Sequence, residues 1–462
     1  MDDFRKIDFQ KILSSLLTYG GQHAEVYCER QASTSIVCEG DKIEKVISGL
    51  DAGIGLRLIK NFKTAYAYTN DFSERSLLSL ARDLSDAFRS KDSSTKDITI
   101  STLSPNLALP VQIDPGGVEI SKKIDFVSQA NREARCQNNI NQVKVVYRDF
   151  RKEILIVNST GTLTEETRIG TVFLVEVVAK KSDVLQTGYE PVGGSLGLEI
   201  FEKYPPDAVS RQACDRANLM LDAERAPGGV MSVVLSSEAG GTMIHEAVGH
   251  GLEADLADKN LSVYSNKIGK QVASPLITVF DDSTLPERRG SFVFDDEGAS
   301  SQKTVLIESG VLVNYMYDFF SAEKAGKRST GNGRRESYRH KPIPRMTNTV
   351  IAPGKTDPRD IISSVDKGLF VKKMGGGQVN TVNGQFVFEV SEGYLIENGK
   401  LKNPVRGAIL TGSGPEVLHT ISIVGSDLGF GIGTCGKDGQ GVPVSDAQPT
   451  LLIPAITVGG KV

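Results

Sequence analysis

The sequence predicts an α+β fold: an N-terminal domain of sheet and helices, followed by a β-rich C-terminal domain that carries one central helix. Three observations lead to this expectation. β-branched and aromatic runs at hairpin spacing fill residues 24–69, and amphipathic helical patterns follow them. Beyond residue 226, short apolar runs alternate with glycine-rich turns. Finally, 39% apolar and 24% charged residues in a chain of 462 are typical of a globular protein of two or three domains.

The periodicity of apolar residues in the N-terminal half predicts several helices and strands. They are, in chain order, a helix over 8–18, an antiparallel meander of short strands over 24–69, helices over 73–89 and 120–136, strands near 142–148, 152–158 and 169–180, and a helix over 206–224. A polar and then proline-rich stretch over 90–116 predicts a long loop. The turn at 226–229 predicts a boundary, so we expect domains of residues 1–225 and 226–462.

The C-terminal half is predicted to form antiparallel sheets, because short runs of β-branched and aromatic residues follow one another between turns. The predicted strands cover 276–280, 291–294, 304–307, 311–316, 386–390 and 393–396. One helix is expected in this half, directly after an apolar run at 233–235 and a small-residue turn.

Charge and composition exclude several functional classes. The net charge of −4 gives no reason to expect a nucleic-acid partner. Apolar runs are too short and interrupted for a membrane span, and the N-terminal residues lack the apolar core of a signal peptide. We therefore expect a cytoplasmic protein without a membrane partner. The five scattered cysteines include no C-x-x-C pair and predict free thiols.

Two of the chain's five histidines lie in one short segment, His245-Glu246-Ala247-Val248-Gly249-His250. Neutral imidazoles bind borderline-soft divalent ions such as Zn²⁺, and a carboxylate beside them can take a proton from the attacking water. The segment therefore predicts a catalytic metal centre, with His245 and His250 as ligands and Glu246 as general base. Two helix histidines with ordinary surface or core roles are the alternative interpretation.

The spacing of the two histidines is one residue longer than the H-E-x-x-H of common zinc peptidases. On a regular α-helix each residue turns by about 100°, so side chains five positions apart diverge by roughly 140°. Both rings can reach one ion only if the helix widens or breaks between them. Gly249 and Gly251 supply a permissive backbone, and we expect a π-bulge between His245 and His250.

A catalytic zinc site usually has a third protein ligand and an open position for water. One candidate is Cys435 in a glycine-rich segment, because glycines allow close approach of the backbone and Lys437 would favour a thiolate. The competing candidates are His340, His419 and the carboxylates at 295–297. The spacing of these residues leaves the choice open.

Four separated motifs make the sequence similar to the TldD branch of the TldD/PmbA family. They are His245-Glu246-Ala247-Val248-Gly249-His250-Gly251, Asp295-Asp296-Glu297-Gly298, Arg334-Arg335-Glu336-Ser337-Tyr338 with Pro344-Arg345-Met346-Thr347-Asn348-Thr349, and Cys435-Gly436-Lys437-Asp438-Gly439-Gln440. The motifs occur in the family's order, and the resemblance runs over nearly the full length. Proteins of this family were once described as modulators of DNA gyrase and are understood as metallopeptidases.

The resemblance implies one zinc per chain, held by His245, His250 and Cys435, with Glu246 as general base. It also implies unfolded or small peptides as substrates and a dimer that encloses the active site. The partner in that dimer would be a second copy or a metal-less PmbA/TldE-type paralogue. A thiolate ligand cancels one unit of the ion's charge, so deprotonation of water should depend more strongly on Glu246. A regulatory subunit acting on a toxin–antitoxin or topoisomerase partner is the alternative function.

Three further groups of residues are weaker candidates for the site. Arg334, Arg335, Tyr338 and His340 could face the developing oxyanion or clamp a peptide terminus; a structural basic loop is the alternative. Gly376 and Gly377 could line a groove in which an extended peptide adds as a strand, or form simple turns. Asp295, Asp296 and Glu297 could orient the metal-binding histidines, or form only a capped turn.

Overall fold

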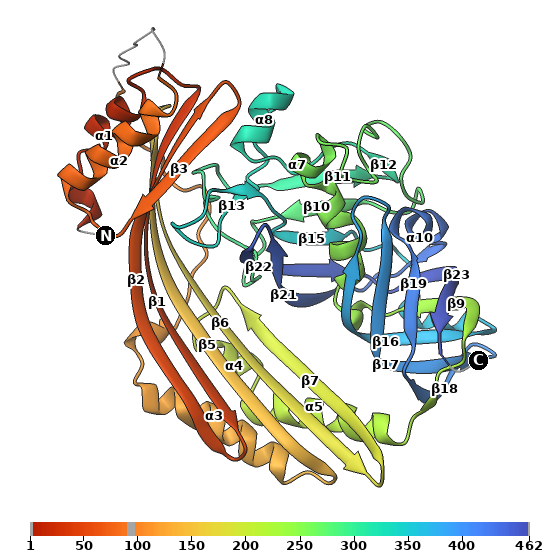
Figure 1. The fold of residues 1–462 in the computed structure, drawn as a ribbon. Coiled ribbons are helices and arrows are strands. Elements are labelled where there is room, and N and C mark those ends of the chain that lie inside the picture. Colours follow the sequence, from red (N-terminus) through yellow and green to blue (C-terminus); the bar gives the residue numbers. More distant parts are fainter. Residues whose placement is uncertain (1–2, 90–97, 461–462) are drawn as a thin grey trace.

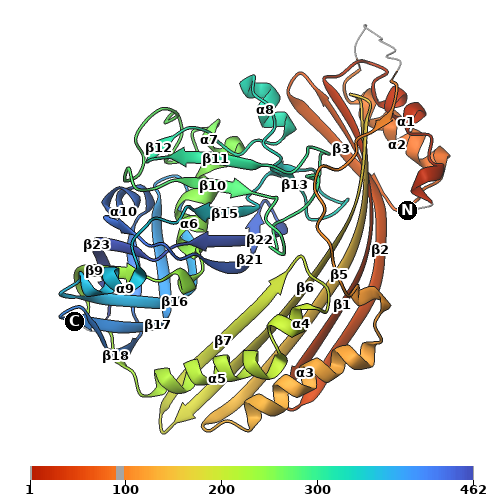
Figure 2. The same cartoon turned by 180° about the vertical axis from the view of Figure 1, so that it is seen from behind.

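The computed structural model describes residues 3–89 and 98–460 and confirms the α+β class. A long, strongly curved sheet with helices on one face forms the N-terminal part, and a more compact β-rich part faces the hollow side of that sheet (Figures 1 and 2). Of the predicted loop over 90–116, residues 90–97 lie outside the described residues. The remainder contains only the short strand β4 (Ser101–Thr102) and a 3₁₀ turn, η2 (Pro115–Gly117).

The long sheet has the strand order β3-β2-β1-β5-β6, with β4 and β7 both pairing with β6. Its strands are β1 (His23–Glu39), β2 (Lys42–Lys60), β3 (Lys63–Thr69), β5 (Ile140–Asn158), β6 (Thr162–Lys181) and β7 (Val184–Gly194). The antiparallel meander is confirmed, but the strands are longer than predicted. The polar stretches at 31–34 and 149–151 do not end a strand, because β1 and β5 continue to pair through them, for example at Ala32 and Arg151.

Helices cover the outer face of this sheet. Four of the predicted helices are confirmed as α1 (Phe9–Leu16), α2 (Glu74–Asp86), α3 (Ile120–Arg135) and α5 (Pro206–Leu221); the short α4 (Ile200–Lys203) and the 3₁₀ turn η1 (Phe4–Lys6) are additional. Apolar side chains of α3 and α5 pack with alternate residues of β1, β5 and β6, such as Ile36, Tyr147 and Phe173. The intervening residues of the same strands therefore face the C-terminal part.

Two sheets form most of the C-terminal part. One has the order β12-β11-β10-β15-β22-β21, from β10 (Val279–Asp282), β11 (Lys303–Glu308), β12 (Val311–Leu312), β15 (Asn348–Ile351), β21 (Gly429–Lys437) and β22 (Gln440–Gln448). The other has the order β16-β9-β23-β19-β17-β18-β8, with β20 (Ile423–Val424) beside β23. Its members are β8 (Glu224–Arg225), β9 (Gly229–Leu235), β16 (Lys367–Val379), β17 (Gln385–Glu397), β18 (Lys400–Arg406), β19 (Ile409–Ser413) and β23 (Leu451–Gly459). A two-stranded ribbon joins β13 (Gly333–Arg334) to β14 (Ile343–Pro344).

Two expectations about these sheets are wrong. The pairing is mixed rather than antiparallel, since β15 and β22, β16 and β9, and β18 and β8 run parallel. Residues 291–294 also form no strand. The backbone N–H groups of Val293 and Phe294 donate instead to the carboxylate of Glu166 on β6, so they are occupied by the N-terminal sheet. The expected boundary after residue 225 stays a prediction; β8, just before it, pairs with β18.

A helical segment lies in the core between the two C-terminal sheets. It runs through η3 (Ser237–Ala239), α6 (Thr242–Ile244), the turn η4 (His245–Gly249), η5 (His250–Leu252) and α7 (Ala254–Ala257). Met243, Val248 and Leu252 are buried in the same apolar cluster as residues of β9, β17 and β23. The chain has three more short helices than expected here: α8 (Phe319–Ala325), α9 (Pro358–Ser363) and α10 (Gly414–Thr420). Of the helices described, none is long and apolar enough to cross a membrane.

Candidate metal centre

The predicted distortion between the two histidines is present as a π-helical turn over His245–Gly249. A π turn brings residues five apart onto one side of the helix, which the α-helical period would not do. A Cβ atom at Gly249 would lie 1.9 Å from Sδ of the buried Met346, so a larger residue there would force that side chain to move. The backbone of the segment is thus fitted closely to its surroundings, and the two histidines share one side of it.

His245, His250 and Cys435 come together in space. One potential ligand atom from each lies within 4.8 Å of those from the other two, and Sγ of Cys435 is 3.6 Å from Nε2 of His250. The two imidazole rings are nearly perpendicular, with centroids 5.0 Å apart. Of the competing third ligands, His340 lies beside the hydroxyl of Ser337, and His419 is exposed on α10. The geometry therefore favours Cys435, which β21 supplies.

A carboxylate contacts Nδ1 of each histidine ring, and neither carboxylate was predicted from the sequence. Nδ1 of His245 lies 2.9 Å from Asp446 on β22, and Nδ1 of His250 lies 3.1 Å from Glu253. Such contacts fix ring orientation and leave Nε2 as the ligand atom. Glu253 could have been found from its position three residues after His250. Asp446 gives no local signal, since only the pairing of distant strands brings it to the site.

The electrostatics of the group suit a bound cation. Burial opposes charging of His250, but the negative charge of Glu253 and the contact with Cys435 raise its pKa to about 10. Burial would raise the pKa of the Cys435 thiol, yet hydrogen bonds with the two histidines lower it to about 6. The pKa of Glu253 falls to about 2 despite its burial, because of the charges of Lys437 and His250. The site thus stabilises a thiolate beside imidazoles.

A cavity of about 380 Å³ opens over these three side chains. Glu246 lines it beside His245, His250 and Cys435. The rest of the wall consists of Leu256 of α7, residues 377–379 of β16, Thr381, the other residues at 434–437 of β21, and Asp438. Gly377 is therefore at the cavity, and Gly376 is its exposed neighbour on β16. Both are strand residues, so the interpretation of this stretch as simple turns is wrong.

The basic residues at 334–340 lie elsewhere. The buried guanidinium of Arg334 donates to the carbonyl oxygens of Met346 and Pro443, and that of Arg335 donates to Glu25 on β1. Tyr338 is buried against Gly53 of β2, and His340 contacts Ser337. None of the four lines the cavity over the histidines. Arg335 and Tyr338 thus join the two halves of the chain, whereas the contacts of Arg334 and His340 lie within the C-terminal half.

The carboxylates at 295–297 do not orient the histidines, which corrects the expectation. Asp295 accepts the backbone N–H groups of Glu297, Ala299 and Gly333, so it does cap a turn. Asp296 pairs with Arg168 and Glu297 with Arg57, both from the long sheet. Local sequence showed the acidic cluster but not the arginines that it binds. Their role, too, lies at the junction of the two halves.

The site combines two histidines, a cysteine thiolate and a nearby carboxylate at an open cavity. This combination is typical of the active sites of metal-dependent hydrolases. Comparison with known families is consistent with that class. Residues 24–88, 113–221 and 228–460 match, respectively, domain 1, the central domain and the C-terminal domain of the PmbA/TldA metallopeptidases. The chain belongs to this family, and its relatives support the TldD branch.

Individual relatives span almost the whole chain. "Metalloprotease TldD homolog" of Haemophilus influenzae is 39% identical, over 95% of this chain and 93% of its own length. "Zinc metalloprotease TldD homolog" of Saccharolobus solfataricus is 26% identical, over 96% and 98%. A Thermotoga maritima crystal structure, described as a candidate modulator of a DNA gyrase, superposes with a TM-score of 0.80 at 19% identity, covering 95% of this chain and 96% of that one. The last likeness shows the fold alone.

Proposed function

We propose that this protein is a zinc-dependent metallopeptidase that hydrolyses peptide bonds in unfolded or small peptides. The observation that carries the proposal is the convergence of His245, His250 and Cys435, with Glu246, on one open cavity. The names of the relatives from Haemophilus influenzae and Saccharolobus solfataricus, one of which includes zinc, support it.

The residues fit a zinc ion by the chemistry of their donors. Two imidazoles and a thiolate are preferred zinc ligands, and three protein ligands leave a position open for catalysis. A zinc ion held there would act as a Lewis acid on the peptide carbonyl and lower the pKa of water. His245, His250 and Cys435 would hold it, in a ratio of one per chain. Asp446 and Glu253 keep the two rings in the required orientation.

Glu246 is the proposed general base. It stands next to His245 at the wall of the cavity and is only partly buried, so its carboxylate can meet water and substrate. It would take a proton from the attacking water and deliver it to the leaving amine. With one thiolate among the ligands, the reaction should depend strongly on this carboxylate.

The walls of the cavity suit an extended chain. β21 is the last strand of its sheet, although Arg289 and Arg345 already donate to the carbonyl oxygens of its Gly433 and Cys435, and the part of β16 beyond residue 375 pairs only with β17. Edge strands present unpaired N–H and C=O groups, which bind peptide main chain without regard to side chains. A folded protein could not insert into such a space, so unfolded or small peptides are the proposed substrates. Gly376 leaves room at this wall, whereas the space at the Cβ position of Gly377 is filled by Phe388.

We further propose a cytoplasmic protein that works as a dimer, either of two copies or with a metal-less PmbA/TldE-type paralogue. Family membership supports this assembly. Light scattering of the purified chain, alone and with such a paralogue, would distinguish the two arrangements.

The proposed function is tested by metal content and peptide cleavage measured together. We expect about one zinc per chain by elemental analysis and hydrolysis of unstructured peptides. Both should be lost in Cys435→Ser and in His245→Ala, and retained in His419→Ala, whose histidine is exposed on α10. Zinc retained in Cys435→Ser would overturn the ligand set. A full complement of zinc without hydrolysis would overturn the peptidase and favour a binding subunit.

A further inference from the structure

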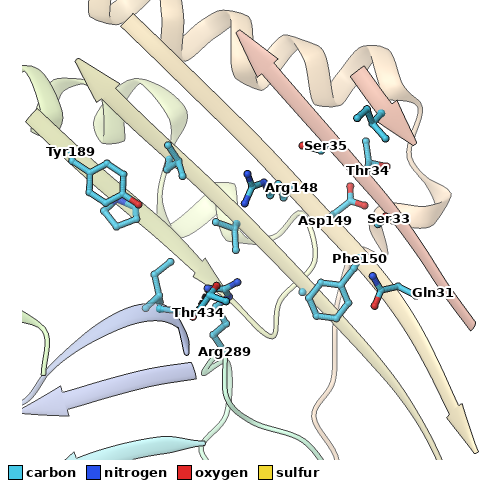
Figure 3. Close-up of a pocket in the computed structure, with 17 residues that line it drawn as sticks. Gln31, Ser33, Thr34, Ser35, Arg148, Asp149, Phe150, Tyr189, Arg289 and Thr434 are labelled. Carbon is cyan, nitrogen blue, oxygen red and sulfur yellow. Dashed lines mark hydrogen bonds between the residues drawn. The ribbon is translucent and has the colours of Figure 1, made fainter. Parts of the chain in front are cut away.

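A second cavity, of about 370 Å³, lies between the hollow face of the long sheet and β21 (Figure 3). Arg148 of β5 and Tyr189 of β7 line it from the sheet, and Arg289 and Thr434 line it from the C-terminal part. The rest of the wall consists largely of hydroxyl, amide and apolar side chains. The cavity belongs to neither half alone, since both supply its cationic groups.

The two arginines lack a counter-ion among the described residues. In the described part of the chain neither Arg148 nor Arg289 forms an ion pair with a carboxylate, although Arg289 donates to the carbonyl oxygen of Gly433. Asp149 also borders the cavity, but Lys123 and Tyr147 occupy its carboxylate on the helix-covered face of the sheet. Two cations therefore share this space without an anion to balance them.

Arg289 is the more constrained of the two. Its Nε is buried and has no hydrogen-bond partner, and burial together with the charge of Arg148 lowers its pKa to about 10. A buried guanidinium without a counter-ion is unfavourable, whereas a bound carboxylate would accept two of its N–H groups and neutralise its charge. Arg148 and Arg289 therefore form a site suited to an anion that is not part of the described chain.

Thr434 connects this cavity to the candidate metal centre. It lines both cavities, and it precedes Cys435 on β21. Arg289 binds the carbonyl oxygen of Gly433, which is two residues, or about 7 Å, from Cys435 along the strand. A peptide extending along β21 from the histidines would reach the arginines within a few residues.

We propose that Arg148 and Arg289 bind a carboxylate of the peptide substrate, on the C-terminal side of the bond that is cleaved. The inference rests on the proposed function, because it assigns the second cavity to the same substrate. The carboxylate is the free C-terminus of a short peptide or an acidic side chain a few residues beyond the cleaved bond. The two arginines determine specificity, because they favour peptides whose carboxylate lies close to the cleavage site.

Binding is tested on zinc-loaded Glu246→Gln protein, which should hold peptides without cutting them. The probes are three octapeptides of alanine and serine labelled with fluorescein at the N-terminus: one with a free C-terminus, one with a C-terminal amide, and one amide that ends in glutamate. Fluorescence anisotropy should show that amidation weakens binding roughly tenfold or more, as expected for charge-assisted hydrogen bonds. The glutamate peptide shows whether a side chain can replace the terminus.

Arg148→Gln is the diagnostic variant, because its exposed side chain has no partner to lose among the described residues. In this variant all three peptides should bind equally weakly. Arg132→Gln, which removes the same charge from an exposed position on α3, should behave like the parent. With Glu246 intact, Arg148→Gln should raise KM for the free-acid peptide and leave kcat unchanged.

The outcomes separate this inference from the proposed function. Equal binding of all three peptides by the Glu246→Gln protein, with hydrolysis by the unsubstituted protein intact, would overturn the carboxylate site alone. A preference for the acid that survives in Arg148→Gln would overturn it as well. No hydrolysis of any peptide by the zinc-loaded unsubstituted protein would overturn the proposed function, and the present inference with it.

Discussion

Nδ1 of His245 lies 2.9 Å from Oδ1 of Asp446, although the two residues are 201 positions apart in the chain. The contact joins the π-helical turn to β22, the strand that pairs with β21 and so also positions Cys435. A single strand pair therefore fixes both a ligand and the orientation of another ligand. The zinc affinity of the site should depend on this contact as well as on the ligands.

Asp446→Asn is expected to weaken zinc binding about 10- to 100-fold, the range typical of residues that orient a metal ligand. The amide keeps the size of the side chain but removes the charge that favours the imidazole orientation. Competition with a chelator measures the change. Glu253→Gln should have a similar effect through His250, whereas Asp360→Asn, at an exposed position on α9, should have none. Unchanged affinity in Asp446→Asn would show that the contact does not support the site.

Glu246→Gln should keep its zinc and lose turnover by a factor of roughly 10²–10⁴, the contribution typical of a general base. Glutamine has the same shape as glutamate but cannot accept the proton. Elemental analysis and initial rates of peptide hydrolysis on the same sample give the two quantities. Substantial residual activity would mean that another group takes the proton.

Gly249→Ala should damage the metal site, because the added methyl group would overlap Sδ of Met346 and displace the π-helical turn. We expect a loss of zinc affinity together with a loss of stability of about 1–3 kcal/mol, as for other overpacked positions. Gly436→Ala is the matched control. It lies next to Cys435, but its added Cβ would meet nothing within 4 Å. If both variants bind zinc like the parent, the backbone at Gly249 is not under the constraint that the structure indicates.

The sequence predicted the part of the site that lies within one segment. His245, Glu246 and His250 are close in the chain, and the five-residue spacing itself required the π-helical turn that the structure contains. Cys435 could be chosen among several candidates only through the family resemblance. Asp446 could not be predicted at all, since the antiparallel pairing of β21 with β22 and the parallel pairing of β22 with β15 decide its position.

Buried charges explain the other differences. The patterns at 295–297 and 334–338 indicated functional chemistry, because clustered charged residues are common at active sites. Their partners are Glu25, Arg57 and Arg168 on strands of the long sheet, and buried charges require such partners. No periodicity shows which distant strand supplies them. The strands β1 and β5 are longer than predicted for a related reason: polar residues at their centres face the C-terminal part or, like Asp149, bind Lys123 of α3, and they do not end the strand.

The junction of the two halves should respond to pH through Glu297. Burial, together with the charges of Asp318 and Glu25, raises the pKa of this carboxyl to about 7, against the opposing charge of Arg57. Its ordinary value is 4.5. Between these pH values the folded chain holds a proton that the unfolded chain has released. The contribution of Glu297 to stability is therefore complete below pH 4.5 and is lost as the pH rises to about 7.

Glu297→Gln should remove this dependence. Glutamine does not titrate, and its one amide oxygen can keep only one of the two hydrogen bonds that Oε1 accepts from Arg57 and Oε2 accepts from the backbone N–H of Phe319. We expect the variant to gain stability relative to the parent between pH 5 and pH 8, by on the order of 3 kcal/mol at most. Thermal unfolding at both pH values measures the difference, with the exposed Glu308→Gln as control. A stability difference that is the same at both pH values would show that Glu297 is ionised throughout, with Arg57 rather than burial deciding its charge.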